Sequence, residues 1–381
     1  MQRRARGGGQ LAEAAASGEP GPAARPTATL EELVDQGSNG RRSGDRAPRE
    51  RLGHTGPVVS PRPAHVTILL SIRDGERWLD ELLASVRNQS HDEWTLLVRD
   101  DGSSDDGLAV VQRHAAADER IRVLDDADGT LGPAESFMRL LGQVDHGWFA
   151  FCDQDDVWLP EKLAVGLAAA AGAPRCSLVV TDAIVVDADG RELAPSAFAV
   201  HGDREPLTIG RLLVNNVAIG ATVMGDVDLA VAATAATPDG PPVMHDWWVA
   251  LVAAYHGSVI VEPAPTVRWR RHGHTVTGNT PVTLRGRMRR RLSSLERSVT
   301  AARTLQVSGI TPVDAATGRT VAALASVDPR SPSVSQLWTA RQAGVRAWSA
   351  SAQAGLIAAV AGRRWAERTL LVLATCFAHV K

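Results

Sequence analysis

Apolar runs and stretches of helical periodicity alternate along the middle of the chain. The apolar runs are short and typical of buried strands, and they lie at residues 66–71, 94–98, 121–124 and 148–152. Between the first two, apolar residues recur on one helical face at Trp78, Leu79, Leu82, Leu83 and Val86. This order predicts an α/β fold with a mostly parallel central sheet and helices on both of its faces.

The pattern becomes less regular after residue 160. It predicts a helix over 161–171, a strand over 177–181, a loop or hairpin over 183–206, a strand around 219–224, a helix over 246–256 and a strand over 258–262. From residue 281 onward the sequence reads as Ala-rich helices, with five arginines between Arg285 and Arg291. We therefore expect one folded domain over residues 64–280 and a helical C-terminal region over 281–381.

Residues 1–63 differ from the rest of the chain. They are rich in Gly, Ala, Pro and Arg, and their apolar residues are sparse apart from a short run at 30–34. Such a segment buries too little apolar surface to offset the entropy of ordering it. We expect a disordered N-terminal extension.

Composition narrows the class of protein. Of the 381 residues, 44% are hydrophobic and 22% are charged, as in soluble globular proteins. The formal net charge of -2 argues against a general nucleic-acid binder, and three well-separated cysteines argue against a disulfide framework or a Cys-rich zinc site. No apolar run reaches membrane-spanning length, and the N-terminus lacks the apolar core of a secretory signal, so a cytoplasmic location is expected.

An acidic cluster at the end of a predicted strand carries the strongest chemical signal. Asp153, Asp155 and Asp156 directly follow the run at 148–152, at the sheet edge where ligands of such folds bind. Clustered carboxylates repel one another unless a cation balances them, and Mg²⁺ or Mn²⁺ prefers such oxygen ligands. The alternative is a solvated acidic turn.

A second acidic turn, Asp100 to Ser103, follows the strand at 94–98. A carboxylate there can accept a hydrogen bond from a base N–H or a ribose hydroxyl. As an isolated pattern, the Asp-Gly pair in it indicates only a turn.

Two later motifs each permit a structural and a functional interpretation. His245-Asp246-Trp247-Trp248 is either a helix cap followed by core tryptophans, or a carboxylate base beside aromatic platforms for a sugar. The segment 268–274 contains three arginines and two histidines, and is either a basic surface loop or a site for phosphate and metal.

Taken in order, these motifs resemble those of the inverting family 2 glycosyltransferases with a GT-A fold, and most of all the rhamnosyltransferase-like branch. The matching stretch runs from Val66 to about Gly278. The resemblance implies a GT-A nucleotide-diphospho-sugar transferase fold with a helical C-terminal extension. One departure is Arg73-Asp74, which stands where Tyr-Asn is more usual.

The resemblance also assigns roles to individual residues. For the nucleotide, it implies that Ser71 contacts it and that Asp101 binds the base. For the metal and the diphosphate, it implies that Asp156 is the metal ligand, that Asp155 lies near the ribose and diphosphate and assists the metal, and that His272 contacts the diphosphate or metal. It implies that Asp246 is the general base. The implied cofactor is Mg²⁺ or Mn²⁺.

The implied activity is metal-dependent, inverting transfer of a sugar from a nucleotide diphosphate sugar to a hydroxyl of a glycan or lipid-linked acceptor in cell-surface polysaccharide synthesis. Rhamnose or another deoxysugar is the expected sugar. Two alternatives are a metal-dependent nucleotidyltransferase or phosphohydrolase, and a non-catalytic sugar-binding relative. No nucleic-acid partner is expected.

The C-terminal segment raises the question of membrane contact. Arg363, Arg364 and Trp365 precede an apolar stretch at 369–377 that is too short to span a bilayer. It either lies at the headgroup level on the inner face of the plasma membrane, or packs as a helix on the catalytic domain.

Overall fold

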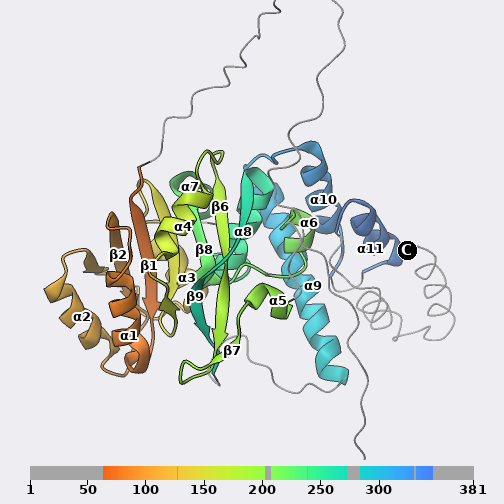
Figure 1. Ribbon diagram of the computed structural model, residues 1–381. Coiled ribbons are helices and arrows are strands. Elements are labelled where there is room, and N and C mark those ends of the chain that lie inside the picture. The colour runs from red at the N-terminus through yellow and green to blue at the C-terminus, as the bar shows by residue number, and fades with distance from the viewer. Residues whose placement is uncertain are drawn as a thin grey trace, which may run out of the picture. The chain divides into compact units, whose positions relative to one another are not determined.

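The computed structural model describes residues 63–201, 207–272, 284–329 and 332–345, except positions 127 and 238. All of them belong to the unit Ser60–Lys381. Its framework is a nine-stranded sheet with the order β3-β2-β1-β4-β8-β6-β9-β5, and β7 pairs with β6 (Figure 1).

The first four strands form the parallel part of the sheet. They are β1 (Val66–Ile72), β2 (Trp94–Asp100), β3 (Ile121–Val123) and β4 (Trp148–Asp153). β1 lies between β2 and β4, so Ser71 is in register with Arg99 on one side and with Asp153 on the other. The predicted strands are therefore confirmed, and their polar ends meet at one edge.

The rest of the sheet is mixed. Its strands are β5 (Val157–Trp158), β6 (Ser177–Val186), β7 (Glu192–Ala194), β8 (Val223–Asp226) and β9 (Ser258–Arg270). β8 runs antiparallel to both β4 and β6, whereas β9 runs parallel to β6. β6 and β9 extend beyond the apolar runs that predicted them, because they pair with each other past Thr181 and Glu262, where polar residues interrupt the pattern.

Helices cover both faces of the sheet, as predicted. One face packs against α1 (Glu76–Arg87), α2 (Gly107–Ala117) and α4 (Lys162–Ala169), and the other against α3 (Pro133–Leu141), α7 (Val227–Ala235) and α8 (His245–His256). Successive residues of β1 explain this, because side chains alternate along a strand. Ile68 and Leu70 join the cluster that contains α1, and Leu69 joins the one that contains α3.

Short elements connect the longer ones. They are α5 (Ala197–His201), α6 (Ile209–Leu212) and the 3-10 helix η1 (Gly220–Thr222). The β6–β7 hairpin followed by α5 confirms the hairpin alternative for residues 183–201, which are the described part of the predicted range.

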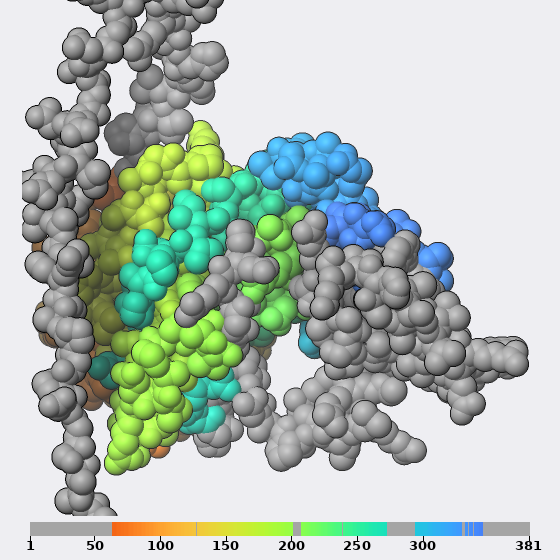
Figure 2. Space-filling model, turned by 45° about the vertical axis from the view of Figure 1, so that its right-hand side comes forward, coloured from red at the N-terminus to blue at the C-terminus, as the bar shows by residue number. Residues whose placement is uncertain are grey.

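The C-terminal region is helical, with α9 (Leu284–Val307), α10 (Ala315–Ala325) and α11 (Val334–Gln342). Leu305 and Leu324 belong to the same apolar cluster as Leu212 of α6 and Tyr255 of α8. In Figure 2 the blue surface of α10 meets the green surface of the segment that contains α6, and α11 packs against α10. The described helices are thus packed onto the sheet domain by shared apolar contacts.

Two predictions fall outside the described residues: the N-terminal extension up to residue 62 and the apolar stretch at 369–377. Within the described ranges, no helix has both the length and the apolar character needed to cross a bilayer.

Candidate active site

The loops after β1, β2 and β4 meet at the carboxyl edge of the parallel strands. The side chains of Ser71 and Asp101 are linked there through two buried residues. Ser71 Oγ donates to Ser136 Oγ over 2.8 Å, and Arg99 Nη1 donates to Ser136 Oγ over 2.8 Å and to Asp101 Oδ1 over 2.6 Å. The two residues assigned to the nucleotide therefore share one network.

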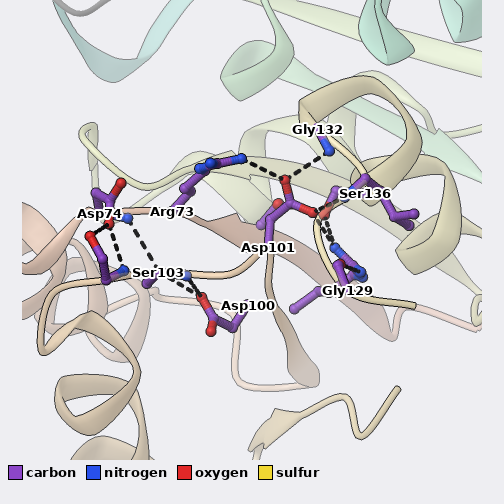
Figure 3. Close-up of polar contacts among 12 residues, drawn as sticks. Arg73, Asp74, Asp100, Asp101, Ser103, Gly129, Gly132 and Ser136 are labelled. Atoms are coloured by element: carbon purple, nitrogen blue, oxygen red, sulfur yellow. Dashed lines mark hydrogen bonds and ion pairs between the residues drawn. The ribbon is translucent and has the colours of Figure 1, made fainter. Parts of the chain in front are cut away.

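The carboxylate of Asp101 is held by several donors, and the residue is only 2% exposed. Its Oδ1 accepts from the Leu131 amide over 2.7 Å, and its Oδ2 accepts from the Gly132 amide over 2.8 Å. Arg73 Nη1 stands 3.9 Å from the same Oδ2 (Figure 3). Asp101 thus fixes the loop before α3 while one oxygen still faces the Arg73 guanidinium.

Sequence reasoning missed Arg99, which is only 1% exposed. Besides Asp101 and Ser136, its guanidinium donates to Asp126 Oδ2 over 2.8 Å and to the Gly129 carbonyl over 2.6 Å. A buried arginine requires acceptors on most of its N–H groups. Its place inside a buried strand, directly before two acids, was the available signal.

A second network joins the loops after β1 and β2. Ser103 donates through its amide and its hydroxyl to Asp100 Oδ1, over 3.0 and 2.6 Å. Asp74 accepts from the Ser104 amide over 2.7 Å, and its own amide donates to Ser103 Oγ over 3.2 Å (Figure 3). Asp100 is therefore a turn-forming residue that supports the first loop.

Gln154 ties the acidic turn after β4 to the loop after β1. Its Oε1 accepts from the Arg73 amide over 2.8 Å, and its Nε2 donates to the Arg73 carbonyl over 2.9 Å. A Cβ atom at Gly75 would lie 2.4 Å from Gln154 Oε1, so any larger residue there would have to displace the Gln154 amide from its hydrogen bonds to Arg73.

Asp155 faces the end of β9. Its Oδ2 lies 2.6 Å from Nε2 of His272, and the imidazole stacks on Trp78 of α1 with ring centroids 4.5 Å apart. Asp155 and His272 were both assigned to the donor site from sequence, and they are adjacent although 117 positions separate them. Trp78 was recognised from sequence only as a helix-face residue.

Asp156, the residue assigned to the metal, turns inward and is 1% exposed. Its Oδ1 accepts from the Arg270 amide over 2.8 Å, and its buried Oδ2 has no hydrogen-bond partner among the described residues. Burial raises the pKa of this carboxyl well above its usual range, with further contributions from Asp155 and Asp153. The two neighbouring acids thus occupy different surroundings.

Asp246 lies in the first turn of α8, where Met244 is the capping position. It is half-buried, and its Oδ1 accepts from the Trp247 amide over 2.6 Å. Burial raises its pKa to about 6, although hydrogen bonds from the Trp247 amide and the Asn216 side chain act in the opposite direction. A carboxylate with such a pKa is suited to accept a proton near neutral pH.

The two tryptophans after Asp246 are core residues. Trp247 and Trp248 are 6% and 0% exposed, and their indole N–H groups donate to the carbonyls of Leu212 and Ala233 over 2.5 and 3.0 Å. Neither indole has an exposed face on which a sugar could stack. The core alternative is therefore correct for both rings.

Asp246 approaches the acidic turn at η1. A Cβ atom at Gly220 would lie 3.6 Å from Asp153 Oδ2 and 3.7 Å from Asp246 Cβ. Burial, together with the charges of Asp155 and Asp246, raises the pKa of Asp153 to about 7. The turn after β4 and the start of α8 are therefore neighbours, although their sequences are far apart.

The side chains that could hold a cation are few. In the described part of the chain, no three His, Cys, Asp or Glu residues are arranged so that together they could hold a metal ion. The Asp155–His272 pair supplies one carboxylate and one imidazole, and Mn²⁺ accepts such ligands together with phosphate oxygens and water. The pair fits a metal that binds together with a diphosphate.

Comparison with known proteins identifies the domain. Residues 67–224 match the family described as Glycosyl transferase family 2, and this segment runs from β1 into β8. The chain therefore contains a family 2 glycosyltransferase domain, which confirms the resemblance seen in the motifs.

Two curated relatives align with parts of the chain. The O-antigen biosynthesis protein RfbC of Myxococcus xanthus is 33% identical over 142 residues, which cover 36% of this chain and 11% of that protein. The dTDP-rhamnosyl transferase RfbG of Shigella flexneri is 29% identical over 94 residues, which cover 24% of this chain and 32% of that protein. The chain thus aligns with a third or less of either relative.

A solved structure shares the fold over a longer stretch. The crystal structure of S. aureus TarS 1-349 in complex with UDP-GlcNAc has a TM-score of 0.50 and 15% sequence identity. The alignment covers 82% of this chain and 87% of that one. This likeness confirms the GT-A type of α/β fold.

Proposed function

We propose that this chain is an inverting glycosyltransferase that uses a nucleoside diphosphate sugar as donor. The observation that carries the proposal is Asp246, a half-buried carboxylate with a pKa raised to about 6 that lies beside the acidic turn of a family 2 domain. The nearness of Asp246 to Asp153 supports a role for Asp246 as the base beside the proposed donor site. The acceptor is proposed to be a hydroxyl of a glycan or lipid-linked sugar, since relatives are named for O-antigen biosynthesis and rhamnosyl transfer.

In the proposed reaction, Asp246 accepts the proton of the acceptor hydroxyl as that oxygen attacks the anomeric carbon. The bond from the anomeric carbon to the diphosphate oxygen breaks on the opposite face, and the diphosphate leaves with the bonding electrons. One displacement inverts the anomeric configuration. General-base assistance of this kind contributes about 10²–10⁴ in rate.

Asp155 and His272 are proposed to hold Mn²⁺ or Mg²⁺ together with the donor diphosphate. When bound, such an ion stabilises the negative charge that develops on the leaving diphosphate. Asp156, assigned from sequence to the metal, is directed into the protein and bonded to the Arg270 amide. In this proposal it shapes the turn, and Asp155 supplies the carboxylate.

Ser71 and Asp101 are proposed to hold the ribose and base. Their shared network with Arg99 and Ser136 supports this, because it fixes both residues at one sheet edge. The proposed transferred sugar is rhamnose or a related deoxysugar. Its proposed donor is a nucleotide sugar of the cytoplasm.

The test is a panel of nucleoside diphosphate sugars incubated with a glycan acceptor and Mn²⁺. Release of an intact nucleoside diphosphate together with a new glycoside of inverted configuration supports the proposal. Release of a nucleoside monophosphate or inorganic phosphate would indicate a phosphohydrolase or nucleotidyltransferase. Sugar binding without any product would indicate a non-catalytic relative.

A further inference from the structure

Helix α1 reaches the candidate donor site through two residues that no sequence motif singled out for that site. Trp78 and Glu81 lie one turn apart on this helix, so their side chains occupy the same face. Each contacts one residue at the end of β9: Trp78 stacks on His272, and Glu81 Oε2 accepts from Arg270 Nη2 over 2.8 Å. Both contacted residues in turn bond to the acidic turn after β4.

The Trp78 contact restrains the imidazole. The two rings are 24° from parallel, and the His272 side chain is 9% exposed, so the indole covers one face of the ring. The Nε2 atom of the same imidazole lies 2.6 Å from Asp155 Oδ2. An imidazole held on its face and at one nitrogen has little freedom to rotate away from the carboxylate.

The Glu81 contact restrains the backbone on the other side of the turn. Arg270 is 3% exposed and donates from Nε to the Asp155 carbonyl over 2.7 Å and from Nη1 to the Ala188 carbonyl over 3.0 Å. Its amide also holds Asp156 Oδ1. The guanidinium therefore joins α1, the acidic turn and the β6–β7 hairpin.

We infer that Trp78 and Glu81 are positioning residues, which hold His272 and Arg270 so that the Asp155–His272 pair is preorganised for the donor diphosphate and its cation. The inference rests on the proposed function and adds helix α1 to the donor site. Residues that orient metal ligands typically affect metal affinity by about 10–100-fold when they are substituted.

The experiment measures binding of UDP and dTDP to the full chain by calorimetry, with and without Mn²⁺. Trp78→Leu removes the aromatic face, Trp78→Phe keeps it, and Asp80→Asn is the matched control, because Asp80 faces Arg113 and His114 on α2. We expect Trp78→Leu to weaken binding in the presence of Mn²⁺ by about 10-fold or more. Trp78→Phe and Asp80→Asn should remain within about 3-fold of the wild type.

A second measurement separates positioning from general destabilisation. In a transfer assay, Trp78→Leu should raise the KM for the donor and the Mn²⁺ concentration for half-activation more than it lowers kcat. Glu81→Gln, which keeps an acceptor for Arg270, should cost less than Glu81→Ala in both quantities. The comparison of Glu81→Gln with Glu81→Ala also tests the inference if Trp78→Leu does not fold.

The inference is overturned if Trp78→Leu and Trp78→Phe bind the nucleotide with Mn²⁺ as tightly as the wild type. Equal losses for Trp78→Leu and Asp80→Asn would overturn it as well. The proposed function fails in a different way, namely if the wild-type chain binds neither nucleotide and transfers no sugar.

Discussion

The side-chain amide of Gln154 pairs with the backbone of Arg73 as a neighbouring strand would, with one hydrogen bond accepted over 2.8 Å and one donated over 2.9 Å. Through this pair the acidic turn after β4 holds the loop after β1 in place. The amide lies so close to Gly75 that a Cβ atom there would stand 2.4 Å from Gln154 Oε1. Gln154, which lies between Asp153 and Asp155, therefore has a steric partner in Gly75, 79 positions earlier in the chain.

This relationship predicts strong coupling between Gly75 and Gln154. Gly75→Ala should destabilise the protein by about 1–3 kcal/mol, because the new methyl group displaces the Gln154 amide. In a Gln154→Ala background the same change should cost less than about 0.5 kcal/mol, since the obstructing atoms are absent. Urea unfolding of the four variants measures the coupling, and additive effects would contradict the described contact.

The surroundings of Asp246 predict opposite effects of Asp246→Asn on activity and stability. Transfer should fall by about 10²–10⁴, because the amide cannot accept the proton. The pKa of Asp246 is raised to about 6, so ionising this carboxyl costs the folded state up to about 3 kcal/mol at pH 8. The variant should therefore unfold at a higher temperature than the wild type at pH 8. Near-wild-type transfer would show that Asp246 is not the base.

The same pKa sets the expected pH dependence. Because Asp246 must be ionised to act, kcat/KM should fall about tenfold per pH unit below a pH of about 6. The raised pKa also means that the stability cost is fully present above pH 6 and disappears as the pH falls towards 4, where the unfolded chain is protonated as well. The stability gain of Asp246→Asn should accordingly shrink over that interval, which thermal unfolding at pH 4, 6 and 8 measures. A gain that is independent of pH would exclude the buried charge as its cause.

His245 is a buried imidazole whose two ring nitrogens have no hydrogen-bond partner among the described residues. It stacks on Phe137 with centroids 4.0 Å apart, and burial lowers its pKa to about 3. His245→Phe keeps the stacked ring and removes two unpaired polar atoms, so it should stabilise the protein by about 1 kcal/mol or more. His245→Ala is the matched control and should destabilise it by leaving a cavity. Destabilisation by His245→Phe would show that the nitrogens have partners in solution.

The amino-acid pattern predicted the parallel half of the sheet because that half follows from local rules. Residues 68–70 and 148–152 are continuously apolar, as strands buried on both faces are, and helical periodicity appears between the first two strands. The carboxyl ends of parallel strands lie at one edge, so the grouping of Ser71, Asp101 and Asp155 was also predictable. The family followed from motifs at these ends.

The tertiary structure decided how those ends are supported and which way each acid faces. Asp155 and Asp156 are neighbours in sequence, yet one faces His272 and the other is buried against the Arg270 amide. The sequence assigned no individual role to Trp78, Arg99 or Arg270, although Arg270 lies in the basic segment 268–274, because the partners that define their roles come from other elements. Glu81 and Arg270, for example, are 189 positions apart. The apolar pattern of a strand determines that the strand is buried. Which distant polar group meets the end of the strand depends on strand order and helix placement, and these are decided only when the elements pack together.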